Sequence, residues 1–293
     1  MKFVVTGSLG NISQPLATTL LGRGHSVTVV SHSSDRRAAI EALGARAAIG
    51  SVTDTAFLAA AFAGADAVYA MVPPNFAAPD SRAHYQAVGS ATAEAIRQAG
   101  VRRVVHLSSW GAELAAGTGF ILGSYDVEQQ LNALPGVAVT HLRAGYLYYN
   151  LLHFIGMIKQ AGFIGSNYGG SDLLALTAPA DVAAAAAEEL TRPTSEPVRY
   201  VASDERTPTE VAQVLGAAIG LPNLAWHLLP AAQVRAAMQH HHLPEAVIAN
   251  SLELNEALHS GALAAGYLAQ RPVLGGVKLE DYAREFAAAY HAA

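Results

Sequence analysis

The chain lacks several residue types and patterns, and each absence narrows the classes of protein that it can belong to. None of its 293 residues is a cysteine, which excludes disulfides, thiol nucleophiles and thiolate metal ligands. Charged residues make up only 14% of the chain and the formal net charge is −5, so we expect no binding to nucleic acid or to a membrane surface. No apolar run approaches the roughly 18 residues of a spanning helix. We therefore expect a cytoplasmic protein whose partner is a small molecule.

Lysine and several catalytic motifs are also scarce or missing. Lysine occurs only at Lys2, Lys159 and Lys278, which restricts any mechanism that needs an ammonium group. The chain contains neither the Gly-x-Ser-x-Gly motif of α/β-hydrolases nor the Gly-x-x-x-x-Gly-Lys motif of P-loop proteins. The run His240–His242 points its imidazoles to different faces and has no second ligand cluster, so we expect no metal site.

Hydrophobic residues make up 52% of the chain, and in its first half they fall into short runs that alternate with amphipathic stretches. The runs predict strands at residues 3–6, 26–30, 46–49, 67–72, 104–108 and 138–142. The stretches between them predict helices at residues 12–22, 35–43, 55–63, 81–99 and 121–134. This order predicts an α/β fold, a Rossmann-type doubly wound parallel sheet.

The alternation weakens after Asn150, where a smaller part of the chain begins. We expect a short helix at residues 151–160, an Ala-rich helix at 181–190 and a seventh strand at 198–202. The domain prediction is a Rossmann domain over residues 1–150, with return elements near 176–203. Residues 151–175 and 204–293 then form a mostly helical, substrate-binding part.

A glycine-rich turn follows the first predicted strand and leads directly into a helix. Gly7 permits a tight turn, and Gly10 lets the backbone approach a pyrophosphate. Ser13 replaces the usual third glycine; it is small enough for close packing, and its hydroxyl offers a further donor to a phosphate. The alternative is a tight turn without a ligand. The residues expected to hold the cofactor here are Thr6, Gly7, Leu9, Gly10, Asn11 and Ile12.

The end of the second predicted strand bears on the choice of dinucleotide. NAD-preferring sites usually place an acid there, whereas this chain has Ser31. The residues that can surround a 2′-phosphate are Ser31, His32, Ser33, Arg36 and Arg37. They favour NADP(H), with NAD(H) as the alternative, and a solvated helix start would explain the arginines without any cofactor. Ser51 and Val52 are expected to contact the adenine, and Asp54 to cap a helix.

Motifs in the first 190 residues resemble the NmrA-like branch of the atypical short-chain dehydrogenases/reductases. They are Thr6-Gly7-Ser8-Leu9-Gly10, Met71-Val72-Pro73-Pro74, His106-Leu107-Ser108-Ser109-Trp110-Gly111-Ala112, Val127-Glu128-x-x-Leu131, Thr140-His141-Leu142-Arg143, Tyr148-Tyr149-Asn150 and Asp181-Val182-Ala183. The resemblance implies a bound NAD(P)(H). Relatives include quinone reductases, other NADPH-dependent reductases and redox sensors that bind the dinucleotide without turning it over.

The resemblance also implies roles for residues at the ends of later strands. Further cofactor contacts are Met71, Val72, Pro73, Pro74 and Ser108. The implied substrate pocket contains Asn75, Trp110, Tyr146, Tyr149, Asn150 and His153. Candidate catalytic residues are Ser109, Tyr125 and Tyr148. The alternative for the tyrosines is that they fill the core with satisfied hydroxyls, and Asn150 would then only cap a helix.

The catalytic pair of the family is missing. Short-chain dehydrogenases carry Tyr-x-x-x-Lys with a glutamate four residues after the lysine. If Glu128 is that glutamate, Ser124 stands at the position of the lysine and Phe120 at the position of the tyrosine. Tyr125 has no lysine at the matching distance. We therefore expect an NAD(P)H-dependent oxidoreductase that reduces a quinone or another small conjugated electrophile by hydride transfer without this pair. The alternative is a non-catalytic, NADP(H)-sensing regulator, and a homodimer through residues 81–99 and 121–134 stays open.

Overall fold

The computed structural model describes residues 1–75 and 78–293, which divide into two compact units. Unit 1 comprises residues 1–112, 123–143 and 182–199. Unit 2 comprises residues 113–122, 144–181 and 200–293. The limits differ from the expected ones, because residues 113–122, 144–150 and 176–181 make most of their contacts within unit 2.

The central sheet has seven strands in the order β10-β6-β5-β4-β1-β2-β3. Their bounds are β1 Lys2–Val5, β2 Ser26–Ser31, β3 Arg46–Ile49, β4 Ala67–Ala70, β5 Arg103–Ser109, β6 Ala138–Ala144 and β10 Val198–Val201. The β1–β2, β1–β4, β2–β3 and β4–β5 pairs are all parallel. The predicted fold class is confirmed, and the predicted strands match those observed to within about two residues at either end.

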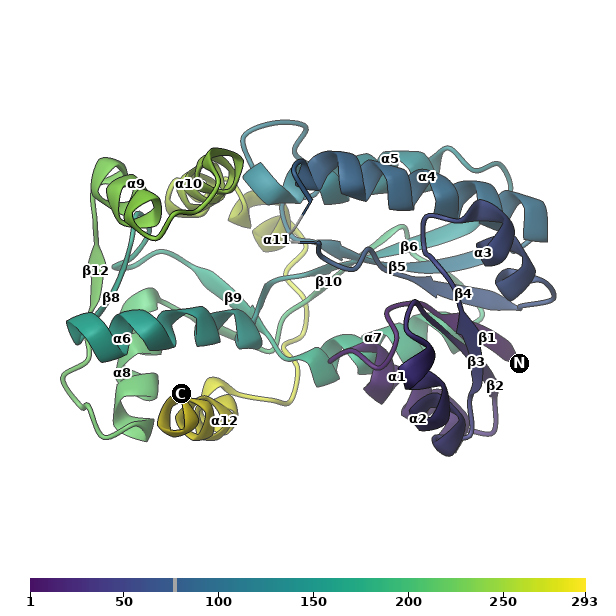
Figure 1. The fold of residues 1–293 in the computed structure, drawn as a ribbon, viewed down its shortest axis with the longest axis horizontal. Helices are drawn as coiled ribbons and strands as arrows, with labels where there is room; N and C mark the ends of the chain where they lie inside the picture. The colour runs from purple at the N-terminus through teal and green to yellow at the C-terminus, as the bar shows by residue number, and fades with distance from the viewer. Residues whose placement is uncertain (76–77) are drawn as a thin grey trace. The chain divides into compact units, whose positions relative to one another are not determined.

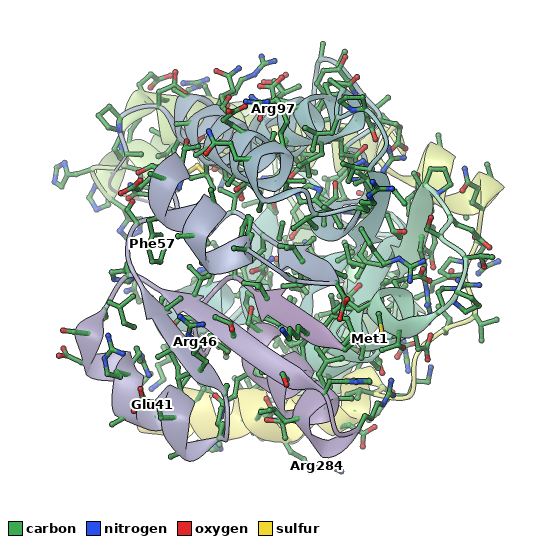
Figure 2. The ribbon with its side chains drawn as sticks, turned by 90° about the vertical axis from the view of Figure 1, so that its right-hand side faces the viewer. Met1, Glu41, Arg46, Phe57, Arg97 and Arg284 are labelled. Carbon is green, nitrogen blue, oxygen red and sulfur yellow. The ribbon has the colours of Figure 1, made fainter. Side chains whose placement is uncertain are left out.

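Helices cover both faces of this sheet (Figure 1). The helices α3 Thr55–Phe62, α4 Ser81–Ala99 and α5 Leu122–Asn132 lie on one face, and α1 Ser13–Gly22, α2 Arg37–Ala42 and α7 Pro179–Thr191 lie on the other. Accordingly, the labelled side chains Arg97 on α4 and Glu41 on α2 lie on opposite sides of the strands (Figure 2). Because both faces are covered, strands such as β4 are buried at every residue.

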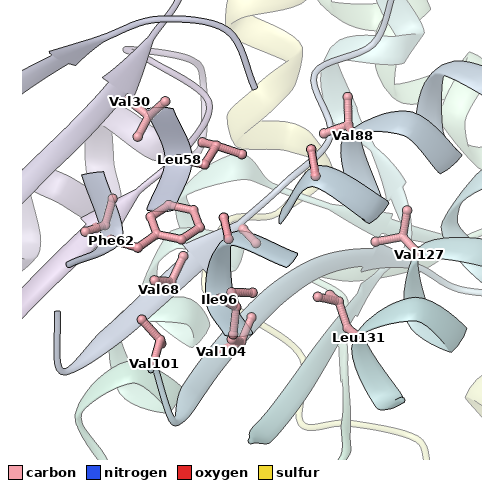
Figure 3. Packing of buried hydrophobic residues seen from close by; sticks show 14 of the residues in the cluster. Val30, Leu58, Phe62, Val68, Val88, Ile96, Val101, Val104, Val127 and Leu131 are labelled. Carbon is pink, nitrogen blue, oxygen red and sulfur yellow. The ribbon is translucent and has the colours of Figure 1, made fainter. Parts of the chain in front are cut away.

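The core between the sheet and α3, α4 and α5 consists of aliphatic side chains and one aromatic ring (Figure 3). Phe62 of α3 and Ile96 of α4 are fully buried and pack with Val68 and Val104 of the sheet. Val127 and Leu131 bring one stripe of α5 into the same cluster. This packing fixes the carboxyl ends of the strands, where the loops of the candidate site begin.

Unit 2 combines two small sheets with helices. The strands β7 Tyr146–Leu147, β9 Leu174–Thr177 and β11 Asp204–Arg206 form one sheet, and β8 Ile164–Ser166 pairs with β12 Trp226–Leu228. Its helical segments are η2 Gly119–Ile121, η3 Tyr148–Phe154, α6 Ile155–Ala161, α8 Pro208–Ala218, α9 Ala231–His240, α10 Glu245–His259, α11 Ala264–Ala269 and α12 Leu279–Ala292. Thr207 and Glu210 form a capping box at the start of α8. In the described part of the chain, no helix has both the length and the apolarity needed to cross a membrane.

Candidate cofactor-binding site

The turn between β1 and α1 has a backbone conformation that requires glycine at its first position. Gly7 has a φ of +91°, and a Cβ there would lie 2.5 Å from the Ser13 Oγ and 3.0 Å from the Met71 side chain. The Gly10 N–H donates to the Gly7 carbonyl oxygen at 3.2 Å and closes the turn. The start of α1 therefore packs closely against the end of β1, as a dinucleotide-binding turn requires.

Backbone donors at this turn are free to bind an anion. Within residues 1–75 and 78–293, the N–H groups of Leu9, Asn11, Ile12 and Ser13 have no hydrogen-bond acceptor. The helix α1 has no capping side chain and no acidic residue in its first turn. Unpaired N–H groups at a helix N-terminus attract negative charge. The turn thus fits the pyrophosphate of a dinucleotide.

Two side chains expected near the phosphates are instead held by the protein. The Ser13 hydroxyl donates to the Thr6 carbonyl oxygen at 2.7 Å, so its proton is not free for a phosphate, contrary to expectation. The Thr6 hydroxyl accepts from the Met71 N–H at 2.9 Å and donates to the Met71 carbonyl oxygen at 3.4 Å. Both hydroxyls therefore tie the turn to the neighbouring backbone.

At the end of β2, Ser31 is buried and its oxygen is already in use. It accepts from the Ser8 hydroxyl at 2.9 Å and from the Ser33 N–H at 3.3 Å. Its own proton points to the Ser33 carbonyl oxygen at 3.5 Å, the limit of a hydrogen bond. Ser31 can therefore offer a ligand only a donor, which suits a phosphate better than a group that must itself donate.

The two arginines after β2 differ in their surroundings. The Arg37 Nη1 lies 3.6 Å from the Glu41 Oε1. Arg36 and His32 are exposed, and neither has an ion pair with any described residue. The Ser33 Oγ accepts from the Asp35 N–H at 3.3 Å, which leaves the Ser33 proton available. Arg36 and Ser33 are thus the groups best placed to receive an added negative charge.

The remaining predicted cofactor residues lie at the ends of β3 and β4. The Ser51 hydroxyl lies 2.8 Å from the Thr53 hydroxyl in an exposed turn, and Val52 beside it is half-buried. Asp54 caps α3 by accepting from the Phe57 N–H at 3.0 Å, as predicted.

After β4, the segment Met71–Asn75 begins half-buried at Met71 and becomes exposed at its far end. Val72 is buried, while Pro74 and Asn75 are exposed. The Pro73 carbonyl oxygen lies 2.9 Å from the His84 Nε2. That contact anchors the segment to the first turn of α4.

The three neighbours at the end of β5 have different environments. Ser108 is buried, and its hydroxyl donates to the Glu128 Oε1 at 2.6 Å. The Trp110 side chain is buried, with only 3% of it exposed. Ser109 is half-buried, and its hydroxyl has no hydrogen-bond partner among the described residues. Of the three, Ser109 alone presents a free hydroxyl at the carboxyl end of the sheet.

The positions of the family's catalytic pair fall in different units. Phe120 lies in η2 of unit 2, whereas Ser124 and Tyr125 lie in the first turns of α5 in unit 1. Lys2 is the only lysine in the sequence of unit 1, and it lies at the amino end of β1. Tyr125 thus has no lysine on its own helix.

A buried polar layer beneath this edge of the sheet was not predicted. The Arg143 guanidinium donates from Nε to the Glu128 Oε1 at 3.0 Å and from Nη2 to the Glu128 Oε2 at 2.7 Å. Glu128 is 2% exposed and Arg143 is 8% exposed. These three side chains come from different elements: Ser108 from β5, Arg143 from β6 and Glu128 from α5. Their spacing in the sequence does not show that they meet.

Two histidines continue this layer. The His106 Nδ1 lies 3.0 Å from the His141 Nδ1, and the His141 Nε2 lies 3.0 Å from the Asn132 Oδ1. Burial lowers the pKa of His106, and the neighbouring His141 lowers it further. Burial also lowers the pKa of His141. Both imidazoles are therefore neutral at neutral pH, and one Nδ1 donates to the other.

The predicted tyrosines of unit 2 do not all have free hydroxyls. Tyr148 is fully buried, and its hydroxyl donates to the Val277 carbonyl oxygen at 3.1 Å, which leaves no proton for catalysis. Tyr146 and Tyr149 are half-buried, and His153 is exposed. Asn150 lies within η3 rather than at the N-cap of α6, which is Phe154.

Neither the histidine run nor any other group forms a metal site in the part of the chain that the structure describes. A surface depression of about 250 Å³ lies at the amino end of β6, lined by Asn132, Val137, Ala138, Val139, Ser195 and Pro197. It is at the opposite end of the strand from the loops described above, and we assign no ligand to it.

Comparisons with known proteins agree with this geometry. Residues 7–193 match a family model described as NAD(P)H-binding, which covers well over half of the chain. A search of curated protein sequences gives no match.

Several solved structures share the fold. The NADPH-dependent quinone oxidoreductase from Escherichia coli in complex with NADPH superposes with a TM-score of 0.82 at 20% identity, over 97% of this chain and 99% of that chain. The triphenylmethane reductase of Citrobacter sp. gives 0.81 at 18% identity, over 98% and 100%. A nucleoside-diphosphate-sugar epimerase from Staphylococcus aureus gives 0.79 at 13% identity, over 97% and 100%.

The resemblance read from the sequence motifs is confirmed. Three observations indicate a dinucleotide-binding protein. Gly7 has a backbone conformation that favours glycine, four N–H groups at the start of α1 have no acceptor among the described residues, and residues 7–193 match the family model. The chain belongs to the NAD(P)H-binding family of the NmrA-like, atypical short-chain dehydrogenase/reductase type.

Proposed function

We propose that this protein is an NADPH-dependent reductase of quinones or of other small conjugated electrophiles. Two observations carry the proposal: the dinucleotide site offers hydrogen-bond donors, and the family's catalytic positions hold Phe120 and Ser124 instead of a tyrosine and a lysine. Leu9, Asn11, Ile12 and Ser13 would hold the pyrophosphate through their free N–H groups. Arg36 and Ser33 would receive the 2′-phosphate of the adenosine ribose. When bound, NADPH supplies a hydride ion to the acceptor.

The preference for NADPH follows from charge at the end of β2. Ser31 stands where an acid would repel a phosphate, and its oxygen already accepts two hydrogen bonds. Arg36 has no competing carboxylate among the described residues. A cationic, donor-rich site stabilises a phosphate dianion more than a neutral 2′-hydroxyl.

A conjugated acceptor is favoured because the chain offers no strong acid at the family positions. Phe120 and Ser124 cannot protonate an alkoxide, so a simple ketone or aldehyde is a poor substrate. A quinone spreads the added charge over its ring and can take protons from water. Ser109 would then orient a substrate oxygen or the nicotinamide carboxamide through its free hydroxyl.

The solved structures support this choice of substrate class. Two of them are a quinone oxidoreductase and a triphenylmethane reductase, and quinones and triphenylmethane dyes are conjugated compounds.

The test is NADPH oxidation by the purified protein with menadione, an enone and a cationic triphenylmethane dye, followed by the loss of NADPH absorbance. We expect turnover with at least one of these acceptors and roughly tenfold slower turnover with NADH. The Ser109→Ala variant should lose activity while its affinity for NADPH, measured by calorimetry, falls by no more than about twofold.

A protein that binds NADPH by calorimetry but oxidises it with none of these acceptors would be the dinucleotide sensor instead. The observation that favours this second function is the missing catalytic pair, because a sensor binds the dinucleotide without turning it over. Absence of NADPH binding would contradict both functions.

A further inference from the structure

Ser8 is not among the residues that the sequence predicts to hold the cofactor, yet it lies in the glycine turn between β1 and α1. Its φ is +56°, a left-handed conformation that residues other than glycine rarely adopt. The Ser8 N–H donates to the Val30 carbonyl oxygen at 3.0 Å, which joins the turn to β2. Glycine would adopt this conformation more easily, so the presence of a serine side chain needs an explanation.

The explanation begins with the hydrogen bond that the Ser8 hydroxyl makes. It donates to the Ser31 Oγ at 2.9 Å. Ser31 is 3% exposed, and its oxygen also accepts from the Ser33 N–H at 3.3 Å, so both lone pairs of that oxygen are in use. The proton of Ser8 therefore has a fixed acceptor, and Ser31 holds the Ser8 hydroxyl in one orientation.

What Ser8 offers to a ligand is consequently an acceptor. Its oxygen keeps two lone pairs, and no described residue donates to it. Ser8 is half-buried, unlike the buried Ser31, so part of this residue is open to a ligand. A ligand group that meets the Ser8 oxygen without displacing Ser31 must be a hydrogen-bond donor, such as a hydroxyl group.

The position of Ser8 indicates which part of a dinucleotide it faces. Ser8 directly precedes Leu9, whose free N–H belongs to the pyrophosphate turn, and it contacts Ser31 at the strand end that receives the ribose in Rossmann folds. The adenosine ribose follows the pyrophosphate in a dinucleotide. In NADPH the 2′ position of this ribose carries a phosphate, so the 3′-hydroxyl is the only hydroxyl that the ribose can donate.

We propose that Ser8 accepts a hydrogen bond from the 3′-hydroxyl of the adenosine ribose, and that Ser31 is a positioning residue that takes the Ser8 proton. The proposal rests on the proposed function in that it takes the dinucleotide to be NADPH. NADH carries the same 3′-hydroxyl. Ser8 therefore contributes affinity for either dinucleotide, whereas Arg36 contributes the preference for NADPH.

The test compares ADP, 2′-deoxy-ADP and 3′-deoxy-ADP, because all three carry the pyrophosphate and differ only in their ribose hydroxyls. Calorimetric titration gives the dissociation constant of each nucleotide for the wild type, Ser8→Ala and Ser8→Gly. We expect the wild type to bind 3′-deoxy-ADP about fivefold more weakly than ADP, the usual loss for one neutral hydrogen bond. In both variants these two nucleotides should bind equally well, because the acceptor is gone.

The ratio of the two dissociation constants separates a ligand contact from a structural role of Ser8. A distorted turn would weaken binding of ADP and 3′-deoxy-ADP alike and leave their ratio unchanged. Ser8→Gly also permits the left-handed turn without a Cβ, so this variant should preserve the backbone. Ser34→Ala is the matched control, because Ser34 is an exposed serine after β2 whose hydroxyl has no partner among the described residues, and it should keep the wild-type ratio.

Three results would overturn the inference. The first is a fivefold ratio that persists in both Ser8 variants, and the second is equal binding of ADP and 3′-deoxy-ADP by the wild type. The third is no measurable binding of ADP by the wild type. A loss of affinity for 2′-deoxy-ADP that depends on Ser8 would instead assign this serine to the 2′-hydroxyl and contradict the 3′ assignment.

The two proposals fail separately. A 3′-deoxy effect that disappears in the Ser8 variants, without NADPH oxidation by any acceptor, would keep the ribose contact and remove the reductase. NADPH oxidation with the same nucleotide ratio in the wild type and both variants would do the reverse.

Discussion

At the scale of single residues, Arg36 and Arg37 are adjacent in sequence but differ in availability. Arg37 is paired with Glu41 on the same helix, whereas Arg36 ends the short segment η1 without an ion pair in the described part of the chain. A cation that is already paired gains less from a phosphate than a free one. Discrimination between the two dinucleotides should therefore depend mainly on Arg36.

Replacement of Arg36 by alanine should weaken NADPH binding about tenfold, or about 1.4 kcal/mol, through loss of a charge-assisted hydrogen bond. NADH binding should change little, because NADH lacks the 2′-phosphate. Calorimetric titration of both dinucleotides measures the difference. Arg37→Ala is the matched control and should have a smaller effect; an equal loss of NADPH and NADH affinity in Arg36→Ala would contradict the assignment.

At the scale of elements, α5 meets the sheet through two different stripes. Val127 and Leu131 enter the apolar core, while Glu128 and Asn132 face polar groups of β5 and β6. A buried ion pair often stabilises less than apolar packing would, so its value can lie in fixing one arrangement. Here it fixes Ser108, and with it the strand end that carries Ser109.

Replacing Arg143 by methionine should lower the free energy of unfolding by about 3–5 kcal/mol, because the Glu128 carboxylate is then buried without its cation. The double variant with Glu128→Gln should recover part of this loss. Urea unfolding of the three proteins measures both effects. A matched control is Arg82→Met, which breaks an exposed pair with Asp126 and should cost no more than about 1 kcal/mol. A similar loss in both arginine variants would contradict the argument.

At the scale of the whole molecule, the buried histidines make stability depend on pH. His106 and His141 have pKa values below the unfolded value of 6.5, so the folded protein resists protonation that the unfolded chain accepts. The stabilisation is present above pH 6.5 and is lost as the pH falls below it. Each neutral histidine contributes a slope of up to about 1.4 kcal/mol per pH unit.

We expect the free energy of unfolding to fall between about pH 7 and pH 5, and the His141→Gln variant to show a shallower fall. His259 acts in the opposite sense, because its hydrogen bond to Asp172 raises its pKa and stabilises the fold at lower pH. His259→Gln should therefore steepen the fall slightly, since this histidine is exposed and its contribution is screened. Denaturant titrations across this pH range measure all three proteins; an unchanged slope in His141→Gln would contradict the assignment.

Association between copies of the chain stays a prediction. Among the described residues of α4 and α5, none is an exposed large hydrophobic side chain, whereas Leu228, Leu268 and Val273 of unit 2 are at least half exposed. A homodimer through α4 and α5 would therefore rely on polar contacts.

The pattern of the first half of the chain was enough to predict the sheet, the helices and the phosphate turn. These features depend on local chemistry: β-branched runs prefer strands, Gly7 is required by a positive φ, and Asp54 and Thr207 cap the helices that follow them. The same pattern missed β8, β9, β11 and β12, which are only three or four residues long and depend on pairing with distant segments. Short strands carry too little periodicity to be predicted alone.

The sequence by itself determined the class of the protein. Two features can be recognised without the folded chain: a glycine turn between a predicted strand and a predicted helix, and the lack of a lysine near Glu128. Only the tertiary structure decided which polar groups are free to act. Tyr148 gives its proton to a carbonyl 129 residues away, Ser108 gives its proton to Glu128, and the Tyr282 hydroxyl is left unpaired among the described residues. A hydrogen bond depends on the position of both partners, and for residues far apart in the chain that position exists only after folding.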